Sequence, residues 1–243
     1  MFRAILDLTH TVSADAPSWE GAPSALTAEV VASHEREGYY VRRISLDEHT
    51  STHLDAPAHM AKAGWTVDQI PAERLLGPLV VLDIGRQARL DIDYRVRNED
   101  IGRWEEQYGM IPPGAVVIAY TGWAARWQTP QAYRNADTEG VLHFPGYSLE
   151  AARLLVDSRS AVGLGIDTLS VDFGPSRDYE VHRFCASRGV YHLENVANPG
   201  QVPPAGAMAV VLPMKLENGS GAPVRIVALV PRTGFAEGIS HDG

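Results

Sequence analysis

The segment Glu48–His59, "EHTSTHLDAPAH", contains three of the nine histidines of the chain, together with two carboxylates and a proline. Four of its side chains, all able to bind metal or carry protons, lie at even spacings: His49, His53, Asp55 and His59. Side chains of one parity share one face of a β-strand, whereas on a helix, at about 100° per residue, they would scatter. Pro57 would also interrupt a helix. The pattern therefore predicts an extended segment with its polar groups on one side.

Distance requires a bend in this segment. A straight strand would separate the backbones of His49 and His53 by about 13 Å, near the limit at which two imidazoles can reach one ion at about 2.1 Å. We therefore expect the chain to bend around Ser51. Pro57 marks a second turn, which would bring His59 back over the other groups.

His49, His53 and Asp55 form a mixed nitrogen and oxygen donor set. Such a set suits Zn²⁺ or Mn²⁺ with open coordination positions better than a closed structural site, in which cysteines dominate. Open positions allow an ion to activate water. The plain alternative is a group of ordinary polar residues on an exposed strand or loop.

The composition is that of a globular protein. With 243 residues, 45% of them hydrophobic, the chain can bury a large core, and we expect one domain over residues 1–243. The formal net charge of −9 and the lack of a basic stripe argue against a nucleic-acid partner. Cys185 is the only cysteine, which excludes an intrachain disulfide. No signal peptide is recognisable and no run approaches 18 apolar residues, so we expect a cytoplasmic protein without a membrane partner.

Short runs rich in Val and Ile and bounded by Gly and Pro predict buried strands at 78–85, 114–122, 161–167, 207–216 and 223–231. A weaker pair of strands is expected at 4–9 and 39–49. The fold class expected from this pattern is α/β or α+β, with more strand than helix.

One helix is predicted over residues 148–159, with Ser148 as its N-cap. The polar stretch before it, residues 126–147, is expected to form a long loop that leaves the body of the domain. The end of the chain, residues 232–243, is expected to be a flexible tail.

The spacing within residues 49–59 resembles the signature of the metal-dependent cyclase family, which includes kynurenine formamidases and isatin hydrolases: His-x-Gly-Thr-His-x-Asp-x-Pro-x-His. One position departs, because Ser51 stands where the family has glycine, the residue that bends at least cost. Three further segments look like the family's first, central and closing segments: "DLTHTVSADAPSWEG", "GIDTLSVD" and "PMKLENGSGAPVRIVAL".

A further block, "VHRFCASRGVYHLENVANP", is similar to the family's second pair of metal ligands, a histidine and a glutamate twelve residues apart. His182 and Glu194 occupy these positions. The resemblance implies one or two divalent ions, Zn²⁺ or Mn²⁺, held by His49, His53, Asp55, His182 and Glu194. Asp55 would bridge the two ions.

The resemblance also implies a fold and an activity. The fold is the swivelling β/β/α domain, usually a homodimer or homotetramer. The activity is hydrolysis of a carbon–nitrogen amide bond in a small molecule by metal-activated water, with His59 as general acid and base. An aryl formamide such as N-formylkynurenine, an intermediate of tryptophan catabolism, is the leading substrate. A cyclic amide or imide, as for isatin hydrolase, is the alternative, and a non-catalytic metal-binding or ligand-binding protein is a third hypothesis.

Trp19 is the candidate for binding an aryl substrate, because it matches an aromatic position of the family's early segment Pro-x-Trp-Pro-Gly-Asp. This chain lacks the second proline and the aspartate of that segment, which keeps the cyclic-amide alternative open. Trp65 and Trp123 are further candidates for a pocket wall, although each is more often a core residue.

Several other residues are weaker candidates for a role in the site. Cys185 lies three residues from His182, but this spacing in an apolar helical turn favours a packed thiol over a nucleophile. Asp167 and Asp172 flank a strand end, where structural hydrogen bonding is the favoured role. His10 and His143 are candidates for the pocket on position alone.

Overall fold

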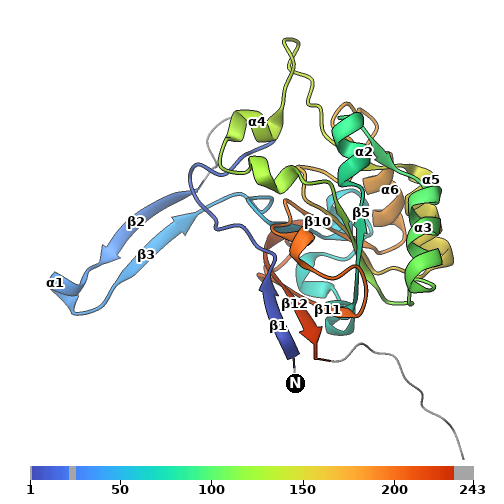
Figure 1. Cartoon of the computed structure of the whole chain (residues 1–243). Helices are drawn as coiled ribbons and strands as arrows, with labels where there is room; N and C mark the ends of the chain where they lie inside the picture. The colour runs from blue at the N-terminus through green and yellow to red at the C-terminus, as the bar shows by residue number, and fades with distance from the viewer. Residues whose placement is uncertain (1, 22–25, 233–243) are drawn as a thin grey trace, which may run out of the picture.

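The computed structural model describes residues 2–21 and 26–232. Within these residues the chain folds around one mixed sheet, and helices gather along one side of it (Figure 1). The tail predicted at 232–243 lies outside the described residues apart from Arg232. None of the helices in the described part of the chain is long and apolar enough to cross a membrane.

Eight strands form the main sheet, here in the order in which they neighbour one another: β1 (Phe2–Asp7), β12 (Gly221–Pro231), β11 (Ala207–Pro213), β5 (Leu76–Asp83), β7 (Val116–Tyr120), β9 (Gly163–Ile166), β10 (Tyr191–Glu194) and β4 (His53–Asp55). The central strands β5, β7, β9 and β10 run parallel, and the remaining pairs are antiparallel. Because β4 also pairs with β12, the sheet closes into a barrel. The prediction of a strand-rich mixed α/β fold is confirmed.

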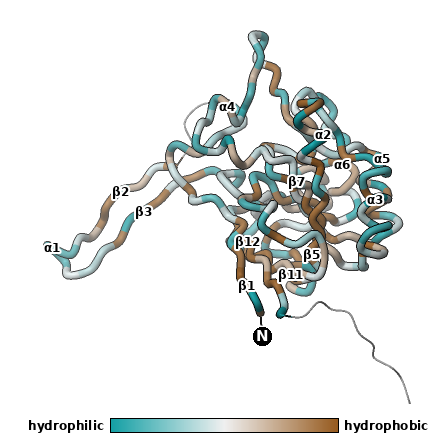
Figure 2. Tube along the Cα trace, viewed as in Figure 1, coloured by the Kyte–Doolittle hydropathy of each residue, from teal (hydrophilic) through white to brown (hydrophobic). Residues whose placement is uncertain are grey.

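The central parallel strands are buried on both faces, which explains why β5, β7 and β9 read as unbroken apolar runs. In β5, Leu79 and Val81 point into the barrel interior, whereas Val80 and Leu82 point outward to the helices. The same alternation continues along β7. Figure 2 shows these strands as brown segments in the middle of the molecule.

Four helices lie on the outer side of the sheet: α2 (Gly85–Leu90), α3 (Asn98–Tyr108), α5 (Leu149–Arg153), which continues as a π-helical turn over Leu154–Ser158, and α6 (Glu180–Ser187). The helix predicted at 148–159 is confirmed, since the Ser148 side chain accepts a hydrogen bond from the Ala151 amide at 3.1 Å. Helix α3 was not predicted, because its sequence is mostly polar and the apolar side chains that it buries are few, chiefly Ile101 and Trp104.

Short 3₁₀ turns complete the body at Pro57–His59, Val67–Gln69, Ala72–Arg74, Trp123–Arg126 and Pro199–Gln201.

A two-stranded arm, residues 27–45, projects from this body (Figure 1). It consists of β2 (Thr27–Ala32), α1 (His34–Glu37) at the tip and β3 (Val41–Ser45). The two weaker strands predicted at 4–9 and 39–49 form, as β1 and β3, but they do not pair with each other. β1 instead covers the edge of the long strand β12, and β3 pairs with β2, its neighbour along the chain.

Residues 126–147 carry structure of their own. They contain α4 (Pro130–Arg134), a hairpin closed by the bridge between Ala136 and Leu142, and β8 (Gly146–Tyr147), which pairs with β6 (Arg95–Val96). Large side chains of this excursion turn inward, and Trp127, Tyr133 and Phe144 pack with Trp123, which precedes the excursion, as an aromatic cluster. The hairpin itself extends outward, as the yellow-green loop at the top of Figure 1.

Candidate active site

The segment 48–59 bends at both positions that the sequence predicted. Ser51 has a left-handed backbone with a φ of 59°, and Pro57 begins a 3₁₀ turn that ends at His59. Between the two bends lies the three-residue strand β4. Leu54 points into the barrel core, so the flanking His53 and Asp55 side chains point to the opposite face.

The neighbouring strand β10 supplies the second half of the site. In the antiparallel pairing, Glu194 lies opposite His53, and His192 lies opposite Asp55. Leu193 points into the same core as Leu54, which leaves Glu194 on the face of the site. Helix α6 adds His182, which is buried at the junction of the helix with the two strands.

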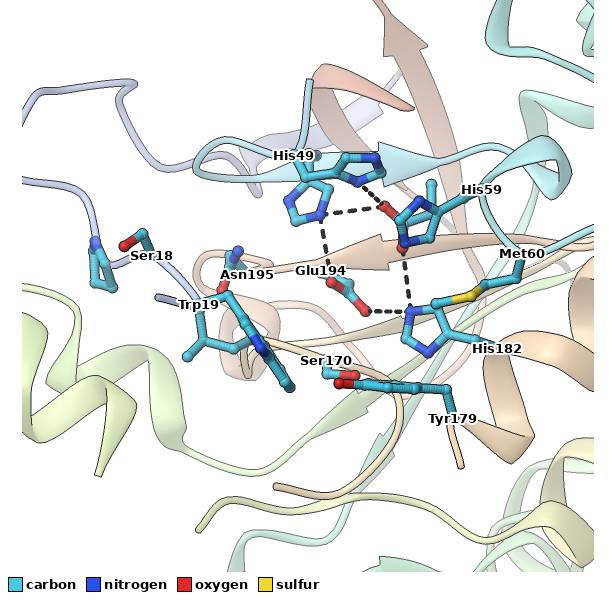
Figure 3. A pocket seen from close by; sticks show the side chains of 14 residues that line it. Ser18, Trp19, His49, His59, Met60, Ser170, Tyr179, His182, Glu194 and Asn195 are labelled. Carbon is cyan, nitrogen blue, oxygen red and sulfur yellow. Dashed lines mark hydrogen bonds and ion pairs between the residues drawn. The ribbon is translucent and has the colours of Figure 1, made fainter. Parts of the chain in front are cut away.

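The five predicted metal ligands meet at one place (Figure 3). Asp55 lies at the centre: its Oδ1 is 2.6 Å from Nδ1 of His49, and its Oδ2 is 3.2 Å from Nε2 of His182. Glu194 lies between two histidines: its Oε2 is 3.3 Å from Nε2 of His53, and its Oε1 is 3.1 Å from Nε2 of His182. Each carboxylate therefore presents one oxygen toward His53 and the other toward His182.

The charges at this cluster favour bound cations. Burial and the nearby Asp55 would both raise the pKa of Glu194, yet hydrogen bonds from His182 and His53 lower it to about 2. Burial would lower the pKa of His53, but hydrogen bonds to Asp55 and Glu194 outweigh it and raise the pKa to about 10. The carboxylates thus stay ionised and hold positive charge close to them. Because histidine binds a metal through a neutral ring, a divalent cation would take the place of the imidazolium protons.

The geometry of the donors fits a small ion as well. His53, Asp55 and Glu194 each offer one ligand atom within 4.8 Å of the others. Asp55 also belongs to two further groups of three potential ligands. One consists of Asp55, His49 and His59, and the other of Asp55, His182 and His192. A set of imidazole and carboxylate donors suits Zn²⁺ or Mn²⁺.

Two hydrogen bonds orient the imidazoles. Asp172 Oδ2 lies 2.6 Å from Nδ1 of His182, and both carboxylate oxygens also accept backbone N–H groups at the start of α6. Nδ1 of His53 lies 2.9 Å from the Ser51 carbonyl oxygen. In each ring the bond at Nδ1 leaves Nε2 facing the carboxylates, which is how proteins fix metal-binding histidines.

A pocket of about 290 Å³ opens onto this cluster. Trp19 and Tyr179 form one wall, with ring centroids 6.2 Å apart, and Met60 and Leu169 add apolar surface. Figure 3 shows His59 on the same side as His49, beside the carboxylates. The predicted aromatic wall at Trp19 therefore lies where a small ring would meet the polar cluster.

His59 differs from the other histidines of the site. Its ring centroid is 4.2 Å from that of His49 and 6.1 Å from that of His182, but it lies in the exposed part of the pocket. Partial removal from water lowers its pKa, so the ring is neutral near pH 7 and able to accept a proton.

Other residues weighed from the sequence lie outside the pocket lining. Trp123 is buried in the aromatic cluster of the excursion, and His143 binds Asp93 at 2.7 Å on the surface. His10 stacks on Trp127, with ring centroids 4.0 Å apart. Cys185 is buried, and burial raises its pKa to about 12, which fits a packed thiol.

Three residues of the site were missed by sequence reasoning. Tyr179 precedes α6 and lines the pocket, and Asn195 follows Glu194 in the same lining. His192 is buried beside His182, with ring centroids 4.6 Å apart, and its Nε2 has no hydrogen-bond partner among the described residues. A signal existed only for His192, which shares the strand face of Glu194 at a spacing of two residues.

A buried carboxylate and imidazole cluster beside a small pocket, with a further imidazole facing into it, is the arrangement of a metal-dependent hydrolase. The comparisons with known proteins agree. The family model described as putative cyclase matches residues 6–173. Isatin hydrolase of Roseibium aggregatum is 33% identical over 196 residues, which are 77% of this chain and 73% of that protein. Kynurenine formamidase of Salinibacter ruber is 28% identical over 92% of this chain and 96% of its own.

Solved structures show the same relationship. Isatin hydrolase A from Labrenzia aggregata, bound to benzyl benzoate, superimposes with a TM-score of 0.87 at 35% identity over 94% of each chain. Isatin hydrolase A from Ralstonia solanacearum gives a TM-score of 0.86 at 32% identity over 93% of this chain and 92% of its own. This chain therefore belongs to the cyclase family, and the resemblance seen in its sequence is confirmed. It is a metal-dependent amidohydrolase.

Proposed function

We propose that this enzyme hydrolyses the amide bond of a small, uncharged aryl substrate, with a cyclic amide of the isatin type favoured over a formamide. The observation that carries the proposal is the pocket between the aromatic wall of Trp19 and Tyr179 and the carboxylate cluster at Asp55 and Glu194. A ring held against the aromatic wall would present its carbonyl group to the cluster.

The composition of the pocket supports the preference for an uncharged substrate. No lysine or arginine lies among the described residues that line it, and its two acidic groups both belong to the cluster. An N-formylkynurenine molecule carries an α-carboxylate and an α-ammonium group, and burying a charge without a partner is costly. A neutral cyclic amide carries no charge that would need a partner in the pocket. The formamide alternative, which would place the enzyme in tryptophan catabolism, needs a partner for those charges.

The proposed chemistry divides between the cation and the chain. When bound, a divalent cation polarises the substrate carbonyl and lowers the pKa of water. His59 accepts a proton as the water oxygen bonds to the carbonyl carbon, and returns it to nitrogen as the carbon–nitrogen bond breaks. Trp19 and Tyr179 hold the ring, and Asp172 keeps His182 in place.

Two ions of Zn²⁺ or Mn²⁺ per chain are the proposed cofactor. Both Asp55 and Glu194 direct one oxygen toward His53 and the other toward His182, so the two carboxylates would hold cations together with both histidines. Two divalent ions against two carboxylates leave net positive charge beside the substrate carbonyl.

The test compares isatin and N-formylkynurenine as substrates of the Zn²⁺-loaded and Mn²⁺-loaded protein. We expect a higher kcat/KM for isatin, and a fall in kcat of about 10² to 10⁴-fold in His59→Ala. Metal content should be unchanged in this variant, since His59 is proposed to move protons and not to bind the ion. Equal turnover by the variant would remove His59 from the mechanism. A lower metal content in His59→Ala than in the wild type would show that His59 is a metal ligand.

A further inference from the structure

The carbonyl group of Ser51 is the start of a hydrogen-bonded chain that leaves the site. It accepts a hydrogen bond from Nδ1 of His53 at 2.9 Å. A carbonyl oxygen only accepts hydrogen bonds, so the proton of the neutral His53 ring lies on Nδ1. The lone pair of Nε2 is then available to bind a cation. Nε2 lies 3.3 Å from both Asp55 Oδ1 and Glu194 Oε2.

The direction of this carbonyl depends on an unusual backbone conformation. Ser51 has a φ of 59°, in the left-handed region that residues other than glycine seldom adopt. Held by nothing else, the peptide could rotate toward a commoner conformation and turn the carbonyl away from His53. The direction of the Ser51 carbonyl therefore depends on hydrogen bonds from neighbouring residues.

Asn195 provides that restraint. Its Nδ2 donates to the Ser51 carbonyl at 2.8 Å, and Thr52 Oγ1 donates to the Asn195 carbonyl at 2.6 Å. Asn195 is buried, follows Glu194 directly and also has a left-handed backbone, with a φ of 55°. Asn195 thus holds the carbonyl of Ser51, and Thr52, the residue after Ser51, holds the carbonyl of Asn195.

Tyr133 in turn orients Asn195. This fully buried tyrosine lies on α4, within the excursion, and its one hydroxyl proton is shared between two acceptors, Asn195 Oδ1 at 2.9 Å and the Asp167 carbonyl oxygen at 2.9 Å. The Ser51 carbonyl only accepts, so the amide nitrogen of Asn195 faces it, and the hydroxyl of Tyr133 holds the other end of the amide through Oδ1. Trp127 packs edge-on against the tyrosine ring at 5.0 Å and holds it there.

We propose that Tyr133 is a positioning residue for the metal ligand His53, acting through Asn195 and the Ser51 carbonyl. Three hydrogen bonds in series, each 2.8 to 2.9 Å long, connect α4 to the imidazole. The excursion at residues 126–147 would thereby control the geometry of the cation site without touching it. This inference rests on the proposed function, because it assumes that His53 binds the cation.

The physical reason is the role of outer groups around a metal ligand. They set its tautomer and the orientation of its ring, and their loss typically weakens metal affinity or activity by about 10 to 100-fold. Tyr133→Phe removes the hydroxyl and keeps the ring, so the aromatic cluster stays filled while the Asn195 amide loses its restraint.

Tyr147→Phe is a matched control. Tyr147 is also fully buried, and its hydroxyl donates to the Gly165 carbonyl at 2.9 Å, in the core cluster between the sheet and the helices. This hydroxyl makes no hydrogen bond to Asn195, Ser51 or His53. Metal-free protein of each variant is titrated with Zn²⁺ by calorimetry, and melting temperatures are recorded on the same samples. We expect similar small losses of melting temperature in both variants. Only Tyr133→Phe should bind Zn²⁺ more weakly, by about 10 to 100-fold.

Asn195→Leu supplies the second variant. If the chain of bonds operates as described, this change weakens Zn²⁺ binding too, and adding Tyr133→Phe to it causes no further loss, because both act through one path. Wild-type Zn²⁺ affinity in Tyr133→Phe, an equal loss in Tyr147→Phe or additive losses in the double variant would overturn the inference. A wild-type protein that binds no Zn²⁺ or Mn²⁺ would instead overturn the proposed function.

Discussion

Ser51 shows how one residue can depart from a family pattern without disturbing the site. Its left-handed backbone costs roughly 1 to 2 kcal/mol for a residue with a side chain. Its hydroxyl lies 3.3 Å from the His10 carbonyl oxygen, an interaction that glycine would lack. The serine therefore recovers part of the cost of the bend that brings the predicted metal ligands together.

This balance leads to a prediction for two substitutions. Ser51→Gly relieves the backbone strain but loses the hydroxyl contact and gains freedom in the unfolded chain, so its free energy of unfolding should stay within about 1 kcal/mol of the wild type. Ser51→Val cannot adopt this backbone easily and should lose both stability and Zn²⁺ affinity. Chemical denaturation and metal titration of the two variants check this. A stable, fully Zn²⁺-binding valine variant would show that the bend does not matter.

At this scale much of the site was accessible from the sequence. Parity and the reach of an imidazole placed His49, His53 and Asp55 together and predicted the bend between them. The partnership with His182 and Glu194 came only from the family resemblance, because no local pattern connects residues more than 120 positions apart. Tyr179 and Asn195 carried no signal, since a lone tyrosine or asparagine has many structural uses.

Among the elements, the hairpin at residues 136–142 is held by an ionic contact that depends on pH. His143 Nδ1 lies 2.7 Å from Asp93 Oδ2, and its Nε2 lies 3.4 Å from Asp137 Oδ2. The hydrogen bond with Asp93 raises the pKa of His143 above its ordinary value. The charged histidine therefore stabilises the fold fully at a pH below the unfolded value of about 6.5, and this contribution disappears as the pH rises through the higher folded value.

We expect a matching pH dependence of thermal stability. The melting temperature of the wild type should exceed that of His143→Gln near pH 6, and the difference should shrink toward pH 9. Thermal unfolding of both proteins across this range measures it, and a histidine titration followed by NMR confirms the raised pKa. A difference that stays constant with pH would show that His143 contributes through packing and not through charge.

The elements also show where sequence patterns succeed and fail. Continuous apolar runs predicted the parallel strands β5, β7 and β9, because parallel strands are buried on both faces, whereas the parallel strand β10 was not predicted. Helix α3 went unnoticed, since a helix on the rim of a sheet needs only a narrow apolar stripe, here little more than Ile101 and Trp104. The pairing of β3 was mistaken because nothing in residues 39–49 distinguishes a strand of the barrel from a strand of the arm.

At the scale of the whole molecule, packing within a single chain does not explain how the arm at residues 27–45 is stabilised. An isolated two-stranded ribbon is marginally stable in water. One face of the arm carries the ion pair between Glu29 and Arg43, whereas the other carries exposed Val30 and Ile44. Figure 2 shows brown segments on both strands of the arm. We propose that the apolar face packs against a second copy of the chain in a homodimer.

The two faces of the arm allow a matched pair of variants. Val30→Ser with Ile44→Ser should convert the dimer to monomer, because it removes the apolar contact. Glu29→Gln with Arg43→Gln alters the opposite face and should leave the dimer intact. Sedimentation velocity measures the mass of each. A wild-type monomer, or equal effects of the two pairs, would contradict this use of the arm.

The closed barrel fixes the order in which the site can assemble. Strand β4 has only three residues and pairs with β10 on one side and β12 on the other, both far along the chain. Contacts between residues so distant in sequence form late in folding, because closing long loops costs entropy before the contacts repay it. In a chain growing from its N-terminus, His49, His53 and Asp55 therefore wait for most of the polypeptide before the rest of their cation site exists. Capture of a cation by the full set of predicted ligands therefore requires that the barrel has closed.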